Sequence, residues 1–528
     1  MLNTAQVSGI KRVVLVGKIP ERDKRTNRHW FQSDLTDWQH GKHWLDSGAP
    51  PVGRFYHKLQ DMQDRREKPY ELSLVEAWFG NIRLSPMQAR EAWELTQHCV
   101  IRSEESMQGL MKSPAATGQQ LWAQSLPAGL DPQIVDDDIA ELIHSTSGQH
   151  HIEHLVAGPN YVEHELTRPL MQQTRGESMS GFSYIDGRFM YAACGNELGV
   201  GPAQWIKGQQ ARELWYGETN MRRVGPFLPA RYHVRVRVPQ DWKTLGILPL
   251  KHTTEDGRRT WVYPNVPGAV FETWVGNEEL RLAEEFGWTI EKFFEAITFT
   301  SKKPAVRGEK RAVAARPLDT FCKRIVKARE NVETIGTANN VAPVVIDAAS
   351  AAIRQILLQT IGSFASRGRS STVTVDSSWD IPPQYAHTAQ RFGDKFVYRE
   401  KIPLSAIPEK QRAYYRPELA SQVWSRARAR VLHGPVAGGE KRGALHVDPA
   451  QLIGINGDAI YTTELPQWAL PVQYGGKDDG AVGRLRMKGY LPAGTPDMAL
   501  PTTIEARLRL ARRAENAGIG GAIQQLGL

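Results

Sequence analysis

The chain has few cysteines and lacks long apolar runs. Its 528 residues include only Cys99, Cys194 and Cys322, too few and too scattered for a disulfide framework or a cysteine zinc cage. We expect them to be buried thiols. No uninterrupted apolar run approaches the ~18 to 20 residues that span a bilayer, and residues 1–9 lack the order of a secretory signal. The sequence therefore predicts a soluble, cytoplasmic protein with no membrane partner.

Acidic residues are outnumbered by basic ones, 57 to 66, which gives a net charge of +9. The excess is concentrated between residues 302 and 330, where ten bases face three acids, and smaller groups follow. The bases of interest are Lys302, Lys303, Arg307, Lys310, Arg311, Arg316, Lys323, Arg324, Lys327 and Arg329, then Arg426, Arg428 and Arg430, then Arg484, Arg486 and Lys488. Phosphate contacts and solvated helix faces both fit such clusters.

Two strand-like segments, far apart in the chain, each end in a carboxylate. Asp186 follows the apolar run Ser183-Tyr184-Ile185, and Asp458 follows Gly454-Ile455-Asn456-Gly457. If the two strands are neighbours, the carboxylates can hold two divalent cations, Mg²⁺ in this chemistry, for phosphoryl or nucleotidyl transfer. Each aspartate alone also fits a turn, and Asn-Gly-Asp is a hairpin signal.

The rest of the chain alternates helical and strand patterns and predicts a mixed α/β enzyme body. Helices are expected over Pro86–Cys99, Asp136–Ile143, Asn277–Gly287 with Asn277 as cap, Asp347–Ile361, Pro417–Leu432, and from the capping box Thr502-x-x-Glu505 to Gly518. Strands are expected over Tyr232–Val238, Trp261–Pro264 and Val270–Val275, the first extending the sheet of Asp186. Composition marks Ser113–Pro132 as a loop or boundary.

Four of these segments, in this order, resemble the motifs of family B DNA polymerases, particularly the protein-primed type of phages and linear plasmids. Asp186 and Tyr191 fit D-x-x-S-L-Y-P, and residues 354–366 lie over K-x-x-x-N-S-x-Y-G-K-F-A-S with Gly362 and the Phe-Ala-Ser end matched. Asn456-Gly457-Asp458-Ala459 lies over D-T-D-S, and Lys488-Gly489-Tyr490 matches K-x-Y. The resemblance covers residues 184 to about 490.

The resemblance implies a right-hand polymerase with palm, fingers and thumb, which adds deoxynucleotides to a DNA primer with two Mg²⁺ ions. Residues 1–140 would form a reduced or replaced exonuclease domain, 141–300 and 386–490 the palm, 301–385 the fingers and 491–528 a thumb-like helical tail. It makes Asp186 and Asp458 the catalytic metal ligands, places Tyr191, Arg354 and Gly362 at the incoming nucleotide, and places Lys488 and Tyr490 at the primer strand. From the basic segment we expect Lys323 and Lys327 to contact DNA. Priming by a terminal protein or by a nucleic acid stays open.

The chain departs from the family at functional positions. Arg354 replaces a lysine, Ile361 a tyrosine, and Asn456 an acid. Since arginine grips phosphate but is a poor proton donor, we expect reduced activity, and a polymerase fold kept only for binding DNA is an alternative. No D-x-E precedes Asp186, so we expect no 3′ to 5′ exonuclease.

A different class of function comes from His150-x-x-Glu153-His154. This spacing satisfies H-x-x-E-H, in which two histidines bind zinc and the glutamate acts as base in a metallohydrolase. The pattern needs a helix, and Gly148 and Gly158-Pro159 leave little room for one.

Overall fold

The computed structural model divides the chain into two discontinuous units. The described residues are 2–17, 39–40, 53–56, 70–101, 107, 109–128, 130, 135–147, 153–155, 164–171, 178–217, 225–253, 259–300, 302–303, 313–366, 370–392, 395–401, 413–434, 442–501 and 503–527. The first unit is Met1–Ser125 with Lys323–Tyr415, and the second is Leu126–Cys322 with Arg416–Leu528. Both units mix helices with mostly antiparallel sheets, in agreement with the α/β class.

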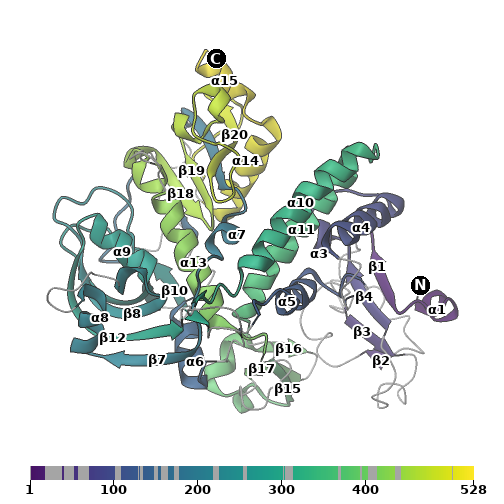
Figure 1. The fold of residues 1–528 in the computed structure, drawn as a ribbon, viewed down its shortest axis with the longest axis horizontal. Helices are drawn as coiled ribbons and strands as arrows, with labels where there is room; N and C mark the ends of the chain where they lie inside the picture. Colours follow the sequence, from purple (N-terminus) through teal and green to yellow (C-terminus); the bar gives the residue numbers. More distant parts are fainter. Residues whose placement is uncertain are drawn as a thin grey trace. The chain divides into compact units, whose positions relative to one another are not determined.

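The second unit contains a five-stranded antiparallel sheet in the order β20-β6-β19-β18-β5 (Figure 1). Its strands are β5 (Glu153–Leu155), β6 (Gly181–Gly187), β18 (Leu452–Asn456), β19 (Ala459–Thr462) and β20 (Leu485–Pro492). On one face Phe182, Tyr461 and Leu491 pack with Leu510 and Ala514 of helix α14 (Ile504–Ala517). Strand β6 lies between β20 and β19, so both of its neighbours come from the C-terminal part of the chain.

A separate sheet of four strands has the order β11-β8-β12-β7. Its strands are β7 (Val200–Lys207), β8 (Ala230–Arg237), β11 (Val270–Gly276) and β12 (Thr289–Thr300). The alternation in β8 is confirmed, since Val234 and Val236 are fully buried while Arg235 and Arg237 face solvent. The expectation that this strand extends the sheet of Asp186 is wrong, because a two-residue period identifies a strand but not its partner.

Shorter elements complete the second unit. They are α6 (Asp137–Thr146), α7 (Met190–Cys194), α8 (Gln209–Tyr216), α9 (Asn277–Glu285), α13 (Pro417–Leu432) and α15 (Gly520–Gln525), with hairpins β9 (Leu250–Thr253) with β10 (Arg259–Val262) and β13 (Lys302–Lys303) with β14 (Val313–Ala314). Two expected caps are shifted by one residue. Gly276 caps α9 in place of Asn277, and Thr503 caps α14 by accepting a hydrogen bond from the Ala506 N–H at 3.1 Å.

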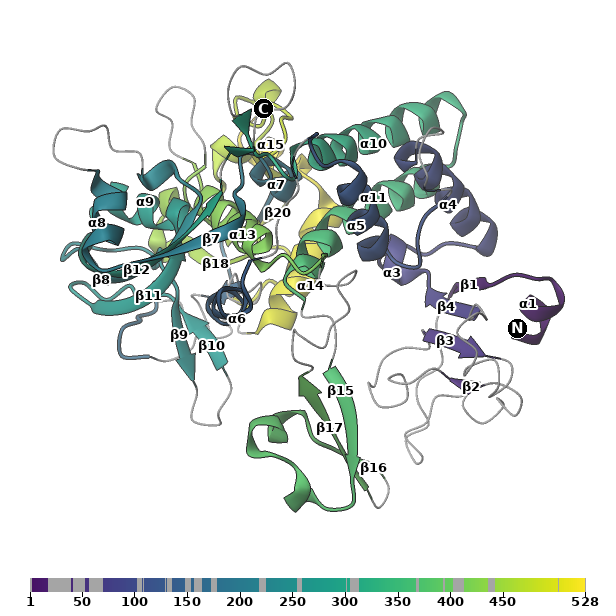
Figure 2. The same ribbon diagram turned by 60° about the horizontal axis from the view of Figure 1, so that its bottom comes forward.

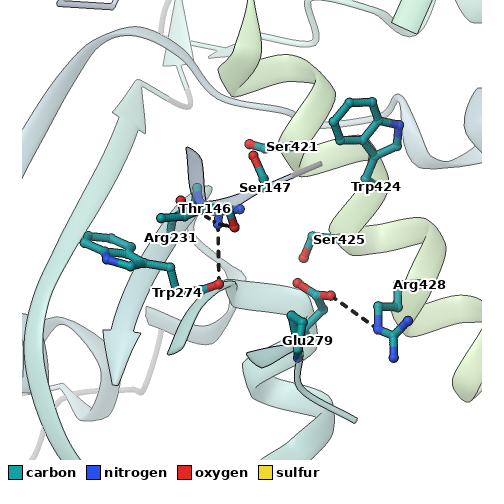
Figure 3. A pocket seen from close by; sticks show the side chains of 10 residues that line it. Thr146, Ser147, Arg231, Trp274, Glu279, Ser421, Trp424, Ser425 and Arg428 are labelled. Carbon is teal, nitrogen blue, oxygen red and sulfur yellow. Dashed lines mark hydrogen bonds and ion pairs between the residues drawn. The ribbon is translucent and has the colours of Figure 1, made fainter. Parts of the chain in front are cut away.

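A buried charge cluster joins α13 to α9 and the four-stranded sheet (Figure 3). The Arg428 Nε lies 3.7 Å from the Glu279 Oε1, and its guanidinium lies 3.6 Å from the centre of the Tyr263 ring. Arg231 donates to the Thr146 carbonyl at 2.9 Å. Burial raises the pKa of Glu279, and the two arginines oppose that rise. The cluster lies where α13 packs on α9 and β11, and α13 also packs on α7, the helix that follows the Asp186 strand.

The first unit packs helices against the long helix α11 (Figure 2). Its helices are α1 (Leu2–Val7), α3 (Glu76–Phe79), α4 (Pro86–Val100), α5 (Pro114–Gln124), most of α10 (Asp319–Ala338), and α11 (Pro343–Phe364). Its sheets are β1-β4-β3-β2 (Arg12–Leu15, Tyr70–Leu74, Gly53–Tyr56, Gln39–His40) and β15-β17-β16 (Ser370–Val375, Lys395–Lys401, Gln390–Phe392). The expected α4 is confirmed, with a Ser85 capping box and Pro86 in its first turn.

The segment Ser113–Pro132, expected as a loop or boundary, contains the division between the two units after Ser125, but its first half is a helix and not a loop. The Ser113 side chain accepts a hydrogen bond from the Ala116 N–H at 3.2 Å, and Pro114 occupies the first helical turn, where it needs no N–H. The resulting helix α5 buries Leu121 and Trp122. Ser113 and Pro114, residue types that are common in loops, therefore begin a helix here.

Among the described residues, α11 is the helix whose length and hydropathy reach the range of a membrane span. It has 22 residues, and half of its most apolar window is buried. The sequence pattern did not indicate this, because Asp347 and Arg354 interrupt the apolar residues. A core helix of a soluble protein satisfies the same criterion, and α11 packs on α3, α4 and α5 in its own unit.

Candidate active site

The structure places Asp186 and Asp458 side by side at one end of the five-stranded sheet. Strands β6 and β19 are antiparallel neighbours with Asp186 opposite Ala459, so Asp458 falls opposite Gly187. The Gly187 N–H donates to the Asp458 carbonyl at 2.9 Å. A β-carbon at Gly187 would lie 3.2 Å from the Asp458 Cβ, so the absence of a side chain at Gly187 leaves room for the side chain of Asp458.

Asp458 lies in a hairpin turn, which confirms the turn interpretation of its motif, and its role as a metal ligand stays a prediction. Gly457 and Asp458 form the two-residue connection between β18 and β19, with Asn456 opposite Ala459. Gly457 has φ +58°, whereas Asp458 is not among the described residues with positive φ. This is the pattern of a type II′ turn, whose twist matches that of the flanking strands. The turn presents Asp458 at the end of β6.

Asp186 is largely buried, at 4% exposure, and has a cation beside it. The Lys488 Nζ lies 3.7 Å from the Asp186 Oδ2 and 3.4 Å from the Tyr184 hydroxyl. Lys488 belongs to β20, the other neighbour of β6. The K-x-Y lysine and the first-motif acid of the sequence are therefore in contact.

The two acids have the oxygen-ligand chemistry that Mg²⁺ prefers. Mg²⁺ prefers oxygen ligands and is usually held by one or two carboxylates together with water and phosphate oxygens. Asp186 and Asp458 supply that number, and the described residues contain no group of three or more His, Cys, Asp or Glu side chains that could hold a metal alone. Substrate phosphates would have to supply the remaining ligands.

The two tyrosines expected near nucleotide and primer are both buried. Tyr191 is 5% exposed and lies on α7, which follows a turn with Phe189 at φ +49°. Tyr490 is 1% exposed and its hydroxyl donates to the Gln525 Oε1 at 2.5 Å. In this arrangement Tyr490 connects β20 to α15, and a direct primer contact would require α15 to move away. Their roles toward nucleotide and primer stay predictions.

The other predicted site residues belong to the first unit. Arg354 and Gly362 lie on α11, where Arg354 is exposed and Ile361 is fully buried. Arg354 and Ile361, which are seven residues apart, therefore do not share a solvent-exposed face of α11, which packs against α4 and α5. Lys323 and Lys327 are exposed one turn apart on α10, and Lys327 pairs with Glu330 at 3.1 Å. Contacts of these four residues with nucleotide or DNA stay predictions.

The arginine cluster on α13 consists of Arg426, Arg428 and Arg430, and the contacts of the first two are with other parts of the fold. Arg428 is 1% exposed and paired with Glu279, as described above. Arg426 donates to the carbonyls of Asn196 and Glu197. Positions two apart on a helix point in different directions, so three arginines at alternate positions cannot form one face. In the next cluster Arg484 pairs with Asp479 at 3.1 Å.

The zinc hypothesis falls partly outside the described residues, which do not include His150. The described part contradicts the helix that H-x-x-E-H requires, because Glu153–Leu155 is strand β5, paired antiparallel with β18. The cysteines give no alternative nucleophile, since burial raises the pKa of Cys99 and of Cys194 to about 11 and keeps both thiols protonated at neutral pH. Cys194 and Cys322 are buried as expected, and Cys99 is half-buried.

Sequence reasoning missed two residues near the acids. Gly187 follows Asp186 directly, and an Asp-Gly pair at a strand end signals close backbone approach. Glu515 lies 2.8 Å from the Lys488 Nζ, but it belongs to no motif in the sequence, so nothing there indicates it.

Comparison with known proteins gives a limited result. No protein-family model matches the chain, and no curated protein matches it. Among solved structures, the orthorhombic crystal form of Phi29 DNA polymerase is similar at 12% identity and TM-score 0.42, over 72% of this chain and 53% of that one. The ternary complex of the same polymerase with primer-template DNA and nucleotide is similar at 10% identity and TM-score 0.44, over 72% of this chain and 54% of that one. The binary complex with primer-template DNA is similar at 11% identity and TM-score 0.44, over 81% of this chain and 67% of that one. The chain thus spans about half of the length of the first two. A TM-score below 0.5 does not establish a shared fold, and the identities carry no information on catalysis.

Proposed function

We propose that this chain is a template-directed DNA polymerase of the protein-primed family B type, which adds deoxynucleotides to a primer by two-metal nucleotidyl transfer, without proofreading. One observation carries the proposal. Asp186 and Asp458 come from motifs far apart in the sequence, and the turn that carries Asp458 lies against the end of β6, where Lys488 contacts Asp186.

The residues have distinct tasks in this reaction. Asp186 and Asp458 supply negative charge at one end of the sheet, Asp186 from strand β6 and Asp458 from the two-residue turn between β18 and β19, which the Gly187 N–H bonds to β6. Bound Mg²⁺ would neutralise charge on the attacking 3′ oxygen and the leaving pyrophosphate. Arg354 would grip the triphosphate with its planar fork, and Tyr191 would exclude a 2′-hydroxyl. Lys488 would bind the primer strand.

Primer extension tests the proposal. The native protein is incubated with a primer-template, deoxynucleotides and Mg²⁺, beside Asp186→Asn and Asp458→Asn variants, which keep the side-chain volume and remove the charge. We expect extension by the native protein and loss of at least 10²-fold in each variant. Asp497→Asn is the matched control, because Asp497 lies in a turn that follows β20, whose last residue, Pro492, pairs with Gly181 at the opposite end of β6 from Asp186.

The outcomes separate the alternatives. A native protein that binds primer-template but never extends it would be a polymerase fold kept for DNA binding. A protein that neither binds nor extends DNA would refute the proposal, and so would extension that survives both substitutions.

A further inference from the structure

Lys488 lies between two acids that belong to different parts of the fold. Its Nζ is 2.8 Å from the Glu515 Oε1 and 3.7 Å from the Asp186 Oδ2. The register between β20 and β6 shifts between Met487 and Gly489, so Lys488 is the extra residue of a bulge, which turns its side chain out of the regular alternation. The lysine side chain is 15% exposed and the Asp186 side chain 6%, so water screens their interaction weakly.

Glu515 is held in place by the close approach of α14 to β20. A β-carbon at Gly489 would lie 1.9 Å from the Ala514 carbonyl oxygen, so the helix backbone rests directly on this glycine. The Tyr490 N–H donates to the Gly518 carbonyl at 3.0 Å, just beyond the helix end. These contacts fix the last turn of α14, and with it Glu515, relative to Lys488.

We infer that Glu515 is a positioning residue, which draws the Lys488 ammonium from Asp186 and so sets the affinity of the Asp186 and Asp458 pair for divalent cations. The inference rests on the proposed two-acid site. An ammonium 3.7 Å from a buried carboxylate competes with any cation for that carboxylate. The shorter contact to Glu515 weakens this competition, and a cation at Asp186 pushes Lys488 further toward Glu515. Helix α14 thereby controls the charge available at the acids.

A double-mutant cycle on Mn²⁺ binding tests this coupling. The free Mn²⁺ signal in electron paramagnetic resonance is titrated with the full-length protein in the absence of DNA and nucleotide. We expect Glu515→Gln to weaken Mn²⁺ binding roughly tenfold, because Lys488 is then left to Asp186 alone. We expect Lys488→Met to tighten binding. In the Lys488→Met background, Glu515→Gln should change binding less than twofold, since the lysine that carries the effect is gone.

The cycle distinguishes this route from direct attraction between Glu515 and the cation. If Glu515→Gln weakens binding by the same factor with and without Lys488, or has no effect in the native background, the inference is overturned. Glu505→Gln on the first turn of α14 is the control, because it makes the same charge change about 15 Å along the helix from Glu515. We expect it to bind Mn²⁺ as the native protein does.

The aspartate variants separate this inference from the proposed function. If Asp186→Asn and Asp458→Asn abolish tight Mn²⁺ binding while Glu515→Gln binds as the native protein, only the role of Glu515 fails. If tight Mn²⁺ binding survives both aspartate substitutions, the two-acid site itself fails and the role of Glu515 fails with it. Urea unfolding of each variant shows whether a change in binding follows from a change in stability.

Discussion

Gly187→Ala should disturb the acid pair without removing either acid. Gly187 is not among the residues with positive φ, so alanine can adopt its backbone conformation. The new β-carbon would lie 2.7 Å from the Met190 Cε, 2.9 Å from the Met190 Cβ and 3.2 Å from the Asp458 Cβ. The methionine methyl group can rotate away. The two β-carbons are attached to α7 and to the β18–β19 turn, so relief requires the backbone to shift.

The size of the effect follows from these distances. Carbon atoms in contact prefer separations of about 3.5 to 4.0 Å, so Asp458 and α7 must each move by several tenths of an ångström. Overpacking of this kind costs about 1 to 3 kcal/mol of stability. Ligand distances in metal sites are held within about 0.2 Å, so the acids lose their joint fit to a cation. We expect Mn²⁺ binding to weaken at least tenfold and primer extension to fall by up to about 10²-fold.

Mn²⁺ titration, primer extension and urea unfolding of the same preparation measure the three effects. Gly520→Ala is the matched control, since a β-carbon there meets no heavy atom within 4 Å and has no positive φ to oppose it. We expect the control to be unchanged or slightly stabilised, because alanine favours the helix α15. A Gly187→Ala protein that binds Mn²⁺ as tightly as the native one would refute the reasoning from close packing.

Two further predictions concern charge elsewhere. Glu418 is fully buried, and burial raises its pKa to about 7, against the opposing effect of Arg416. Because the pKa of Glu418 is raised in the folded state, its contribution to the free energy of unfolding is present below about pH 4.5 and is lost as the pH rises through 7. Glu418→Gln should therefore match the native protein in urea unfolding at pH 4.5 and exceed it at pH 8 by on the order of 3 kcal/mol; equal differences at both pH values would contradict this. For DNA binding, the double substitution Lys323→Gln with Lys327→Gln should reduce the slope of log affinity against log salt by about 2. Lys243→Gln, which removes one exposed lysine of the second unit, is the comparison. An unchanged slope in the double variant would remove α10 from the DNA surface.

Local signals in the sequence predicted local structure well. Ser85 with Pro86 marked the start of α4, and Pro417 marked the start of α13, because caps and first-turn prolines act within a few residues. Strand pairing is a long-range property, so the alternation of β8 gave no information on which sheet it joins. Composition misled over α5, where Ser113 and Pro114 begin a helix.

The candidate site was predicted in part. The order of motifs indicated that Asp186 and Asp458 belong together, and strand pairing brings them side by side. Charge counting could not separate Arg428, which faces Glu279 in the interior, from arginines at the surface. Glu515 was beyond prediction, because its contact with Lys488 depends on how α14 lies across β20. Contacts made by packing leave no pattern along the chain.

The position of β6 has a consequence for biosynthesis. A ribosome completes this strand early, but the segments that flank it, beginning at Ala459 and Leu485, emerge only after most of the remaining chain has been made. At roughly 5 to 20 residues per second the delay is on the order of tens of seconds. Throughout that interval both sides of the strand carry open backbone groups that other chains can pair with. Nascent protein should therefore depend on protection by chaperones, and fragments that stop before Ala459 should aggregate.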